Sequence, residues 1–147
     1  MSTTKRISTA PAAPKPPISL GPAITISDSA SLLGTKLITI GGDSVVHPRA
    51  KLISSLAPVT IGKACILSER SAVGLQSPSN DQPDGVVIED CVVVEVGAVV
   101  EAKRVGEGTI VETNARVGKG AVIGKVCVIC THLLHHTDEL LVQSTVR

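Results

Sequence analysis

The chain has 147 residues, a formal net charge of +1 and 43% hydrophobic residues, yet it contains no Phe, Tyr or Trp. The missing rings exclude aromatic stacking on nucleic acid, and the near-zero charge provides no basic footprint for a phosphate backbone. With 20 Val and 13 Ile residues, the chain is also too rich in β-branched aliphatics for a disordered segment. Its length allows one domain, filled by medium-sized aliphatic side chains.

Residues 1–22 contain five of the nine prolines and no acidic residue. Because prolines such as Pro11 would break the amphipathic helix of a mitochondrial presequence, this segment is predicted to be a flexible Pro-rich arm. No membrane insertion is expected, since Glu89, Glu95 and Glu101 interrupt the most apolar stretch before it reaches the ~18 residues of a membrane-spanning helix. The four cysteines follow no secretory signal and are expected to be reduced, intracellular thiols.

Aliphatic residues recur every six positions along most of the chain, with insertions before residues 61 and 88 and one residue dropped before 105. The fourteen positions are Ile40, Val46, Leu52, Ile61, Leu67, Val73, Ile88, Val94, Val100, Val105, Val111, Val117, Ile123 and Ile129. The residue four places later is usually small, and the residue one place later is often Gly or Glu. Residues six apart point to the same side of a strand, whereas on a helix they would drift around the axis.

The repeat predicts an all-β domain over residues 23–131. Three sixes make one coil of a triangular prism, and each inward aliphatic side chain stacks on its equivalent in the next coil. We expect a parallel β-helix of about six coils, in which Gly beside the aliphatic residue relieves the bend. A polar loop is expected near 75–87, and a short tail or cap over 132–147. A sandwich of short strands would explain the Val content, but not the fixed spacing of six.

Local details of this sequence resemble one branch of the hexapeptide-repeat family. They are the stretch 38–53 with its Val-Val-His-Pro-Arg-Ala block, the insertion before Pro-Val-Thr-Ile-Gly at 58–62, and the polar loop that returns to the repeat at Val87–Ile88, followed by Val-Glu-Val-Gly at 94–97. Together they resemble the β-helical subunits of dynactin's pointed-end complex, over about residues 24–130.

This resemblance implies a left-handed β-helix and a non-catalytic structural and adaptor role. It also implies a hetero-oligomer with dynactin subunit 5, the pointed-end actin-related protein and dynactin subunit 4. Such a complex helps dynein–dynactin to engage cargo for microtubule-based transport, in the cytoplasm and on the cytoskeleton. The family normally continues past the last hexads with another coil and a C-terminal helix, where this chain has only residues 133–147.

Hexapeptide-repeat proteins also include γ-class carbonic anhydrases and acyltransferases, so a degenerate enzyme of this kind is the alternative interpretation. The carbonic-anhydrase pattern needs three His residues, but the positions that would follow His47 are occupied by Pro83 and Ile88. The loop over residues 75–85 contains no His, Lys, Arg or Cys that could serve as a general base. We therefore predict no catalytic residue, cofactor-binding residue or metal ligand, and we expect His47 to pack at a corner.

The most metal-like cluster is the pair Cys127 and Cys130, which three histidines follow. These are His132, His135 and His136. The spacing is denser than zinc modules usually have, and the chain has no second closely spaced Cys pair. Because Cys127 occupies the small-residue position of its hexad, core packing is the preferred interpretation and a zinc site the alternative.

Two further motifs invite a chemical interpretation. The glycines of 106–108 and 118–124 resemble phosphate-binding loops, but such loops open a helix, and here the hexads continue unbroken. Glu95 and Glu112 should occupy equivalent places on adjacent coils, where they would form a pair of like charges. We expect solvated corner residues there rather than an acid–base pair.

Overall fold

The structure is a computed structural model in which residues 15–76 and 85–131 are described. These residues form seventeen short strands. The strands are β1 (Ile18–Leu20), β2 (Thr25–Ile26), β3 (Ser31–Gly34), β4 (Ile38–Ile40), β5 (Val45–Val46), β6 (Lys51–Ser54), β7 (Val59–Ile61), β8 (Ile66–Leu67), β9 (Ala72–Val73), β10 (Val86–Ile88), β11 (Val93–Val94), β12 (Val99–Val100), β13 (Arg104–Val105), β14 (Ile110–Val111), β15 (Arg116–Val117), β16 (Val122–Ile123) and β17 (Val128–Ile129). The predicted C-terminal tail or cap lies outside the described residues.

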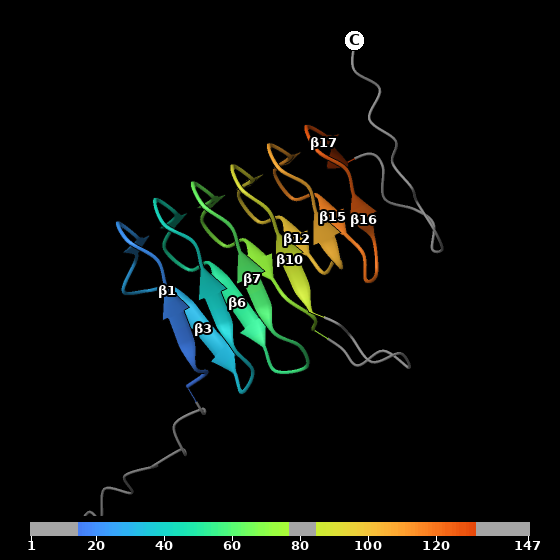
Figure 1. Ribbon diagram of the computed structural model, residues 1–147. Helices are drawn as coiled ribbons and strands as arrows, with labels where there is room; N and C mark the ends of the chain where they lie inside the picture. The colour runs from blue at the N-terminus through green and yellow to red at the C-terminus, as the bar shows by residue number, and fades with distance from the viewer. Residues whose placement is uncertain (1–14, 77–84, 132–147) are drawn as a thin grey trace, which may run out of the picture.

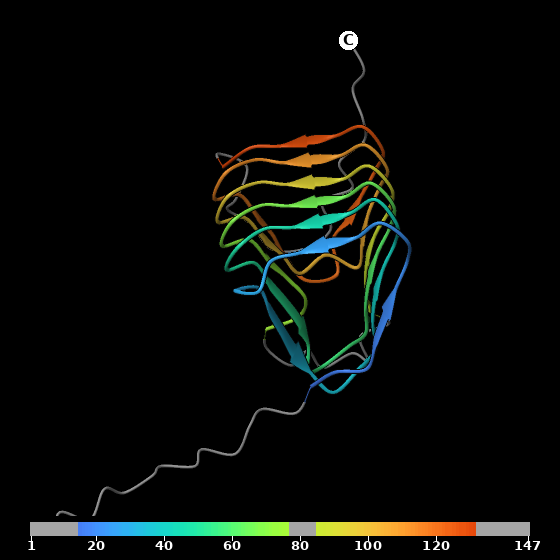
Figure 2. The ribbon, with the colours of Figure 1, turned by 90° about the vertical axis from the view of Figure 1, so that its left-hand side faces the viewer.

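The strands stack into three parallel sheets around a common axis. Sheet A has the order β1-β4-β7-β10-β13-β16, sheet B β2-β5-β8-β11-β14-β17 and sheet C β3-β6-β9-β12-β15. Each coil therefore adds one strand to each sheet, as the repeat predicts. Seen from its N-terminal end, the chain winds counter-clockwise as it recedes from the viewer, so the β-helix is left-handed (Figures 1 and 2). The predicted fold, a left-handed parallel β-helix of about six coils, is confirmed.

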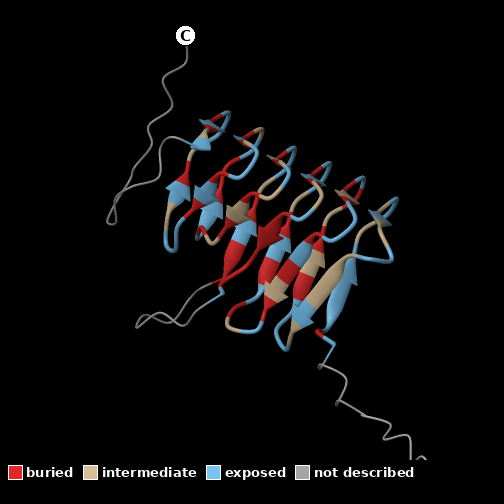
Figure 3. Cartoon of the chain, turned by 180° about the vertical axis from the view of Figure 1, so that it is seen from behind, coloured by how far each residue is buried: buried red, intermediate tan, exposed pale blue. Residues whose placement is uncertain are grey.

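The inside of the prism is filled by the residues of the six-residue repeat. All fourteen predicted positions are buried, and none is more than 7% exposed. Figure 3 shows this as buried segments that recur at the same place on successive strands. In sheet A, for example, Ile40 pairs with Ile61, and Ile61 with Ile88. Equivalent side chains thus meet from coil to coil, and aliphatic side chains of this size fill the interior without overpacking.

The chain turns at the third residue after each inward aliphatic residue. This third residue repeatedly adopts a positive φ. Residues at this position with positive φ are Ala23, Asp43, Arg49, Ala64, Arg70, Cys91, Gly97, Gly108, Asn114, Gly120 and Val126. Gly41 and Gly106, which directly follow the aliphatic residue, do not have a positive φ. A Cβ atom on Gly106 would lie 2.5 Å from the carbonyl carbon of Gly124 on the next coil. At these two glycines the expectation that Gly relieves the bend is therefore wrong, because what they permit is close approach between coils. Gly74, which also follows an inward residue, does have a positive φ.

The register between coils is unaffected by differences in coil length. The step from Ile61 to its partner Ile88 takes 27 residues, whereas the step from Ile88 to Val105 takes 17. The extra residues include the predicted polar loop, of which residues 77–84 lie outside the description. Both glycines that flank this loop, Gly74 and Gly85, have positive φ. Insertions thus leave the coil at a corner, and the chain then returns to the same strand register.

The first coil starts earlier than the predicted domain boundary at residue 23. Strand β1 lies within the predicted arm and pairs with β4, so that Ile18 lies opposite Ile38 and Leu20 opposite Ile40. In β1 the aliphatic residues Ile18 and Leu20 flank a polar residue, as the two Ile residues of β4 do. This shared alternation of aliphatic and polar residues explains the pairing. The arm's flexible character, and the remaining boundaries, stay predictions.

Candidate functional site

One face of the prism carries a column of outward-facing aliphatic side chains, three of which are exposed and two half-buried. On sheet B the outward residue of each strand lies opposite the outward residue of the next, and five of these residues in a row are Val or Ile. This column, which we call the aliphatic ladder, consists of Val45, Ile66, Val93, Ile110 and Val128. Ile66 is 38% exposed, Ile110 37% and Val128 52%. With a coil spacing of ~4.8 Å, the ladder is about 19 Å long.

The other two faces are mixed in character. The outward column of sheet A is Ser19, Thr39, Thr60, Val87, Arg104 and Val122. The outward column of sheet C is Ser31, Lys51, Ala72, Val99 and Arg116. Only sheet B, among the described strands, places uncharged aliphatic side chains at five consecutive levels. A flat apolar surface of this kind is typical of a protein–protein contact.

The sequence predicts a flat, aliphatic-rich face that could dock on another prism, but the residues of the ladder were not identified from it, although they could be read there. Each member directly precedes an inward residue of the repeat, as Ile66 precedes Leu67 and Ile110 precedes Val111. A tabulation of the residues before each hexad position would have found the ladder. The hexad pattern itself is defined by the inward residue and the residues one and four places after it, so it does not include the ladder position.

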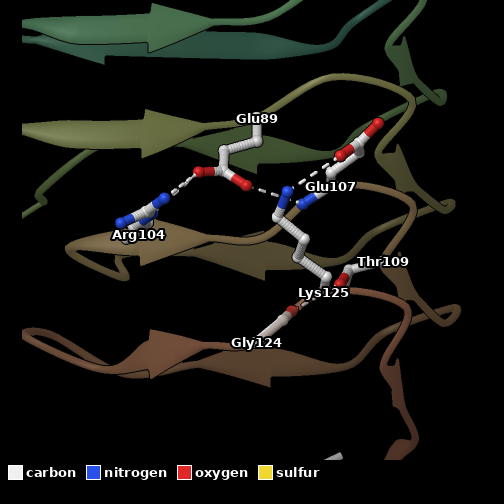
Figure 4. Close-up of polar contacts among 6 residues, drawn as sticks. All are labelled: Glu89, Arg104, Glu107, Thr109, Gly124 and Lys125. Carbon is white, nitrogen blue, oxygen red and sulfur yellow. Dashed lines mark hydrogen bonds and ion pairs between the residues drawn. The ribbon is translucent and has the colours of Figure 1, made fainter.

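A network of charged side chains joins successive coils on another part of the surface (Figure 4). One carboxylate oxygen of Glu89 accepts hydrogen bonds from the Arg104 guanidinium, with a distance of 2.8 Å to Nε, and the other accepts the Glu107 amide at 2.9 Å. Lys125 Nζ in turn lies 3.0 Å from Glu107 Oε2. The hydrogen bond from Arg104 is the main cause of a lowered pKa at Glu89, and the bond to Glu107 raises the pKa of Lys125. This network fastens coils together, with little energy from each exposed pair.

Buried hydroxyl and thiol groups make a second set of links, at the small-residue position of the repeat. Thr109 Oγ1 donates to the Gly124 carbonyl at 2.9 Å and accepts the Cys127 amide at 3.2 Å (Figure 4). Ser44 Oγ makes the equivalent pair of contacts three coils earlier, with the Gly62 carbonyl at 3.0 Å and the Cys65 amide at 3.1 Å. Where this position carries a hydroxyl, as at Ser44 and Thr109, the side chain links one coil to the next.

The cysteines at this position are packing residues of the coil. Cys65 and Cys127 are both buried, and the Cys65 thiol donates to the Glu89 carbonyl at 3.0 Å. Burial is the main cause of a raised pKa at Cys65, which keeps the thiol protonated. The histidines that follow Cys130 lie outside the described residues. Within residues 15–76 and 85–131, no group of three or more His, Cys, Asp or Glu could hold a metal ion.

The other residues singled out from the sequence do not converge on a common point. His47 is exposed, and its amide donates to the Leu67 carbonyl at 2.9 Å. Ile88 is a buried core residue, and Pro83 lies outside the described residues. In the glycine-rich stretch 118–124 the structure has strand β16, so that the chain does not open a helix there.

Glu95 and Glu112 do occupy equivalent places on adjacent coils, since each follows a residue of the paired strands β11 and β14. Each carboxylate, however, binds a group on the coil that follows it. Glu95 Oε2 accepts the Thr113 amide at 3.1 Å and the Thr113 hydroxyl at 2.9 Å. A hydrogen bond with Glu112 is the main cause of a raised pKa at the Cys130 thiol. These contacts give both carboxylates a structural role.

Three comparisons with known proteins bear on these observations. No protein-family model matches the chain. A solved structure from Bacillus cereus, of a protein proposed to be an acetyltransferase, matches with 18% identity over 76% of each chain and a TM-score of 0.29. Among the described residues, no helix is long and apolar enough to span a membrane.

The comparison with curated proteins finds dynactin subunit 6 of Danio rerio. The match is 29% identical over 116 residues, and covers 74% of this chain and 60% of that protein. This chain thus spans less than two thirds of the length of the relative that it matches. The resemblance indicated by the hexads and the local motifs is confirmed, in that the chain is similar in sequence to dynactin subunit 6.

Proposed function

We propose that this protein is a non-catalytic structural and adaptor subunit of the dynactin pointed-end complex. In this role it supports cargo engagement by dynein–dynactin and microtubule-based transport, in the cytoplasm and on the cytoskeleton. Its partners are dynactin subunit 5, the pointed-end actin-related protein and dynactin subunit 4. The observation that carries the proposal is the similarity to dynactin subunit 6 over 116 residues.

The aliphatic ladder supports a role in assembly. Ile66 and Ile110 are more than one third exposed, in a column that is uncharged from Val45 to Val128. Covering such side chains removes apolar area from water, which favours association by ~25 cal/mol per Å² before the entropic cost of binding is subtracted. A flat face of two-residue strands is suited to another flat apolar face, such as that of a second β-helix. We therefore assign the ladder to the contact with dynactin subunit 5.

The proposal is tested by co-expression with dynactin subunit 5. The isolated chain is expected to self-associate or to be poorly soluble, and the partner is expected to keep it in solution as a complex. The double variant Ile66→Lys/Ile110→Lys should abolish co-purification, because two ammonium groups would be desolvated in the contact. The matched control is Thr60→Lys, which adds a positive charge to the exposed column of sheet A.

Two results would contradict the proposal. One is a stable monomer that ignores the partner, and the other is co-purification that Ile66→Lys/Ile110→Lys leaves intact while Thr60→Lys abolishes it. The hexapeptide-repeat enzyme makes a different prediction for the same preparation. It would be a homotrimer by light scattering, with stoichiometric metal or bound acyl-CoA.

A further inference from the structure

A groove on sheet C combines positive charge with an apolar floor. Its volume is about 450 Å³. We call it the basic groove, and its defining residues are Arg49, Lys51, Arg70, Ala72, Val99 and Arg116. It lies on strands β6, β9, β12 and β15 of sheet C and the corner before them, whereas the aliphatic ladder lies on sheet B.

The register of sheet C explains the shape of the groove. Lys51 lies opposite Ala72, Ala72 opposite Val99, and Val99 opposite Arg116. Over these four levels, long cationic side chains therefore stand at the first and the last, with short apolar side chains at the two levels between them. With ~4.8 Å between coils, the two cationic ends stand about 14 Å apart.

The charges around the groove are predominantly positive. Arg49 and Arg70 share the carboxylate of Glu69, at 3.2 Å and 3.7 Å. A second carboxylate, that of Glu101, accepts the amide of the lining residue Gln76 at 2.9 Å. No ion pair within the described chain engages Lys51 or Arg116. Four cations thus face two carboxylates that already have partners, on a protein whose formal net charge is only +1.

We propose that the basic groove binds an extended acidic peptide segment with the pattern acidic-x-aliphatic-x-acidic. In an extended peptide, side chains on one face are about 7 Å apart, so the first and fifth residues are about 13 Å apart. That length matches the distance between the levels of Lys51 and Arg116. A peptide lying along the prism axis places its two carboxylates at these cations and its central aliphatic side chain over Ala72 and Val99.

The groove fits a peptide better than a nucleic acid. Its floor is aliphatic, and the chain has no aromatic ring on which a base could stack. Only Lys51 and Arg116 of its cations are free of ion pairs within the described chain, and they lie at the two ends of a short apolar stretch. A phosphate backbone needs a continuous row of positive charges. The inference goes beyond the proposed dynactin role, because it concerns another face and holds for whatever protein carries the acidic segment.

The test measures the binding of a fluorescein-labelled peptide, Ser-Glu-Ser-Val-Ser-Glu-Ser, to the full 147-residue chain by fluorescence anisotropy at low salt. Replacement of both Glu by Gln in the peptide should weaken binding about tenfold, as expected for the loss of two exposed ion pairs. The double variant Lys51→Gln/Arg116→Gln should weaken binding of the Glu peptide by the same factor and leave the Gln peptide unaffected. The matched control is Lys63→Gln, which removes an exposed positive charge that does not line the groove.

A third comparison tests the apolar floor. Val99→Ser should weaken binding of the peptide with a central Val, but not of one with a central Ser. The proposal is overturned if the Glu and Gln peptides bind equally, or if Lys63→Gln weakens binding as much as the double variant. Tighter binding of single-stranded DNA, or of vesicles with anionic lipid, that depends on Lys51 and Arg116 would also overturn it. Lys51, Lys63 and Arg116 are exposed and Val99 is half-buried, and the β-sheet circular dichroism of each variant should match that of the parent chain.

Discussion

Replacing Gly106 by Ala should destabilise the protein strongly, whereas the same change at Gly118 should not. Both glycines directly follow an inward Val of the repeat, and neither has a positive φ. They differ in what lies above them. A Cβ on Gly106 would stand 2.5 Å from the carbonyl carbon and oxygen of Gly124 and 2.6 Å from the amide nitrogen of Lys125. At Gly118 no heavy atom of the described chain lies within 4 Å of the same position.

The magnitudes follow from these distances. A Cβ needs about 3.4 Å to backbone atoms, so the two coils beside Gly106 would have to separate locally by most of an ångström, which we compare to overpacking of a core at about 1–3 kcal/mol. At Gly118 the substitution only reduces the freedom of the unfolded chain, which stabilises by about 0.4–1 kcal/mol. The two variants should therefore differ by about 1.4–4 kcal/mol in free energy of unfolding.

Equilibrium urea unfolding, followed by circular dichroism, measures this difference. For a chain of this size, 1 kcal/mol also shifts the melting temperature by about 2–4 °C. Equal stability of the two variants would refute the idea that these glycines serve close approach between coils. So would a stabilised Gly106→Ala, because relief of chain entropy would then be the only effect of the substitution.

Three further predictions concern the links between coils. Thr109→Val should lower the free energy of unfolding by about 1–3 kcal/mol, because two buried hydrogen bonds lose their hydroxyl, whereas Thr109→Ser should retain most of the stability. The lowered pKa of Glu89 adds stability that is full above the pKa of the unfolded carboxyl and is lost as the pH falls through the lower folded value, so Glu89→Gln should flatten the acid limb of a plot of urea midpoint against pH. A thiol reagent should label exposed Cys91 in the native protein and buried Cys65 only on unfolding, and equal labelling rates would contradict the assigned burial.

The interior of the fold could be predicted from the sequence because its rule is local. An aliphatic residue at every sixth position indicates which side chain points inward, and every such position from Ile40 to Ile129 is buried. The coil that contains Leu20 was partly missed, since the prolines around it suggested an arm. Its strand forms because β4 offers an unpaired edge, which is a tertiary effect that no local pattern records.

The basic groove shows what a local rule cannot supply. Lys51, Val99 and Arg116 belong to different coils, and a step of 27 residues separates Ala72 from its partner Val99. Their alignment depends on the number of residues in each corner before the next strand of sheet C begins. The turn positions were also missed, because residues as different as Arg49 and Val126 adopt the positive φ that composition alone would reserve for Gly or Asn.

The strand register is kept although the coils differ in length, and this has a consequence for which insertions such a protein can accept. A 27-residue step and a 17-residue step end on the same column, so the corner that bears the polar loop is a place where length can vary at no cost to the stack. Loop-closure entropy rises only by about 0.6 kcal/mol for each doubling of a loop. Each corner of the prism thus lies at a fixed level along the axis, whatever the length of the loop inserted there. A new recognition element could be grafted at that corner, at a known distance from the aliphatic ladder and the basic groove, without redesign of the interior.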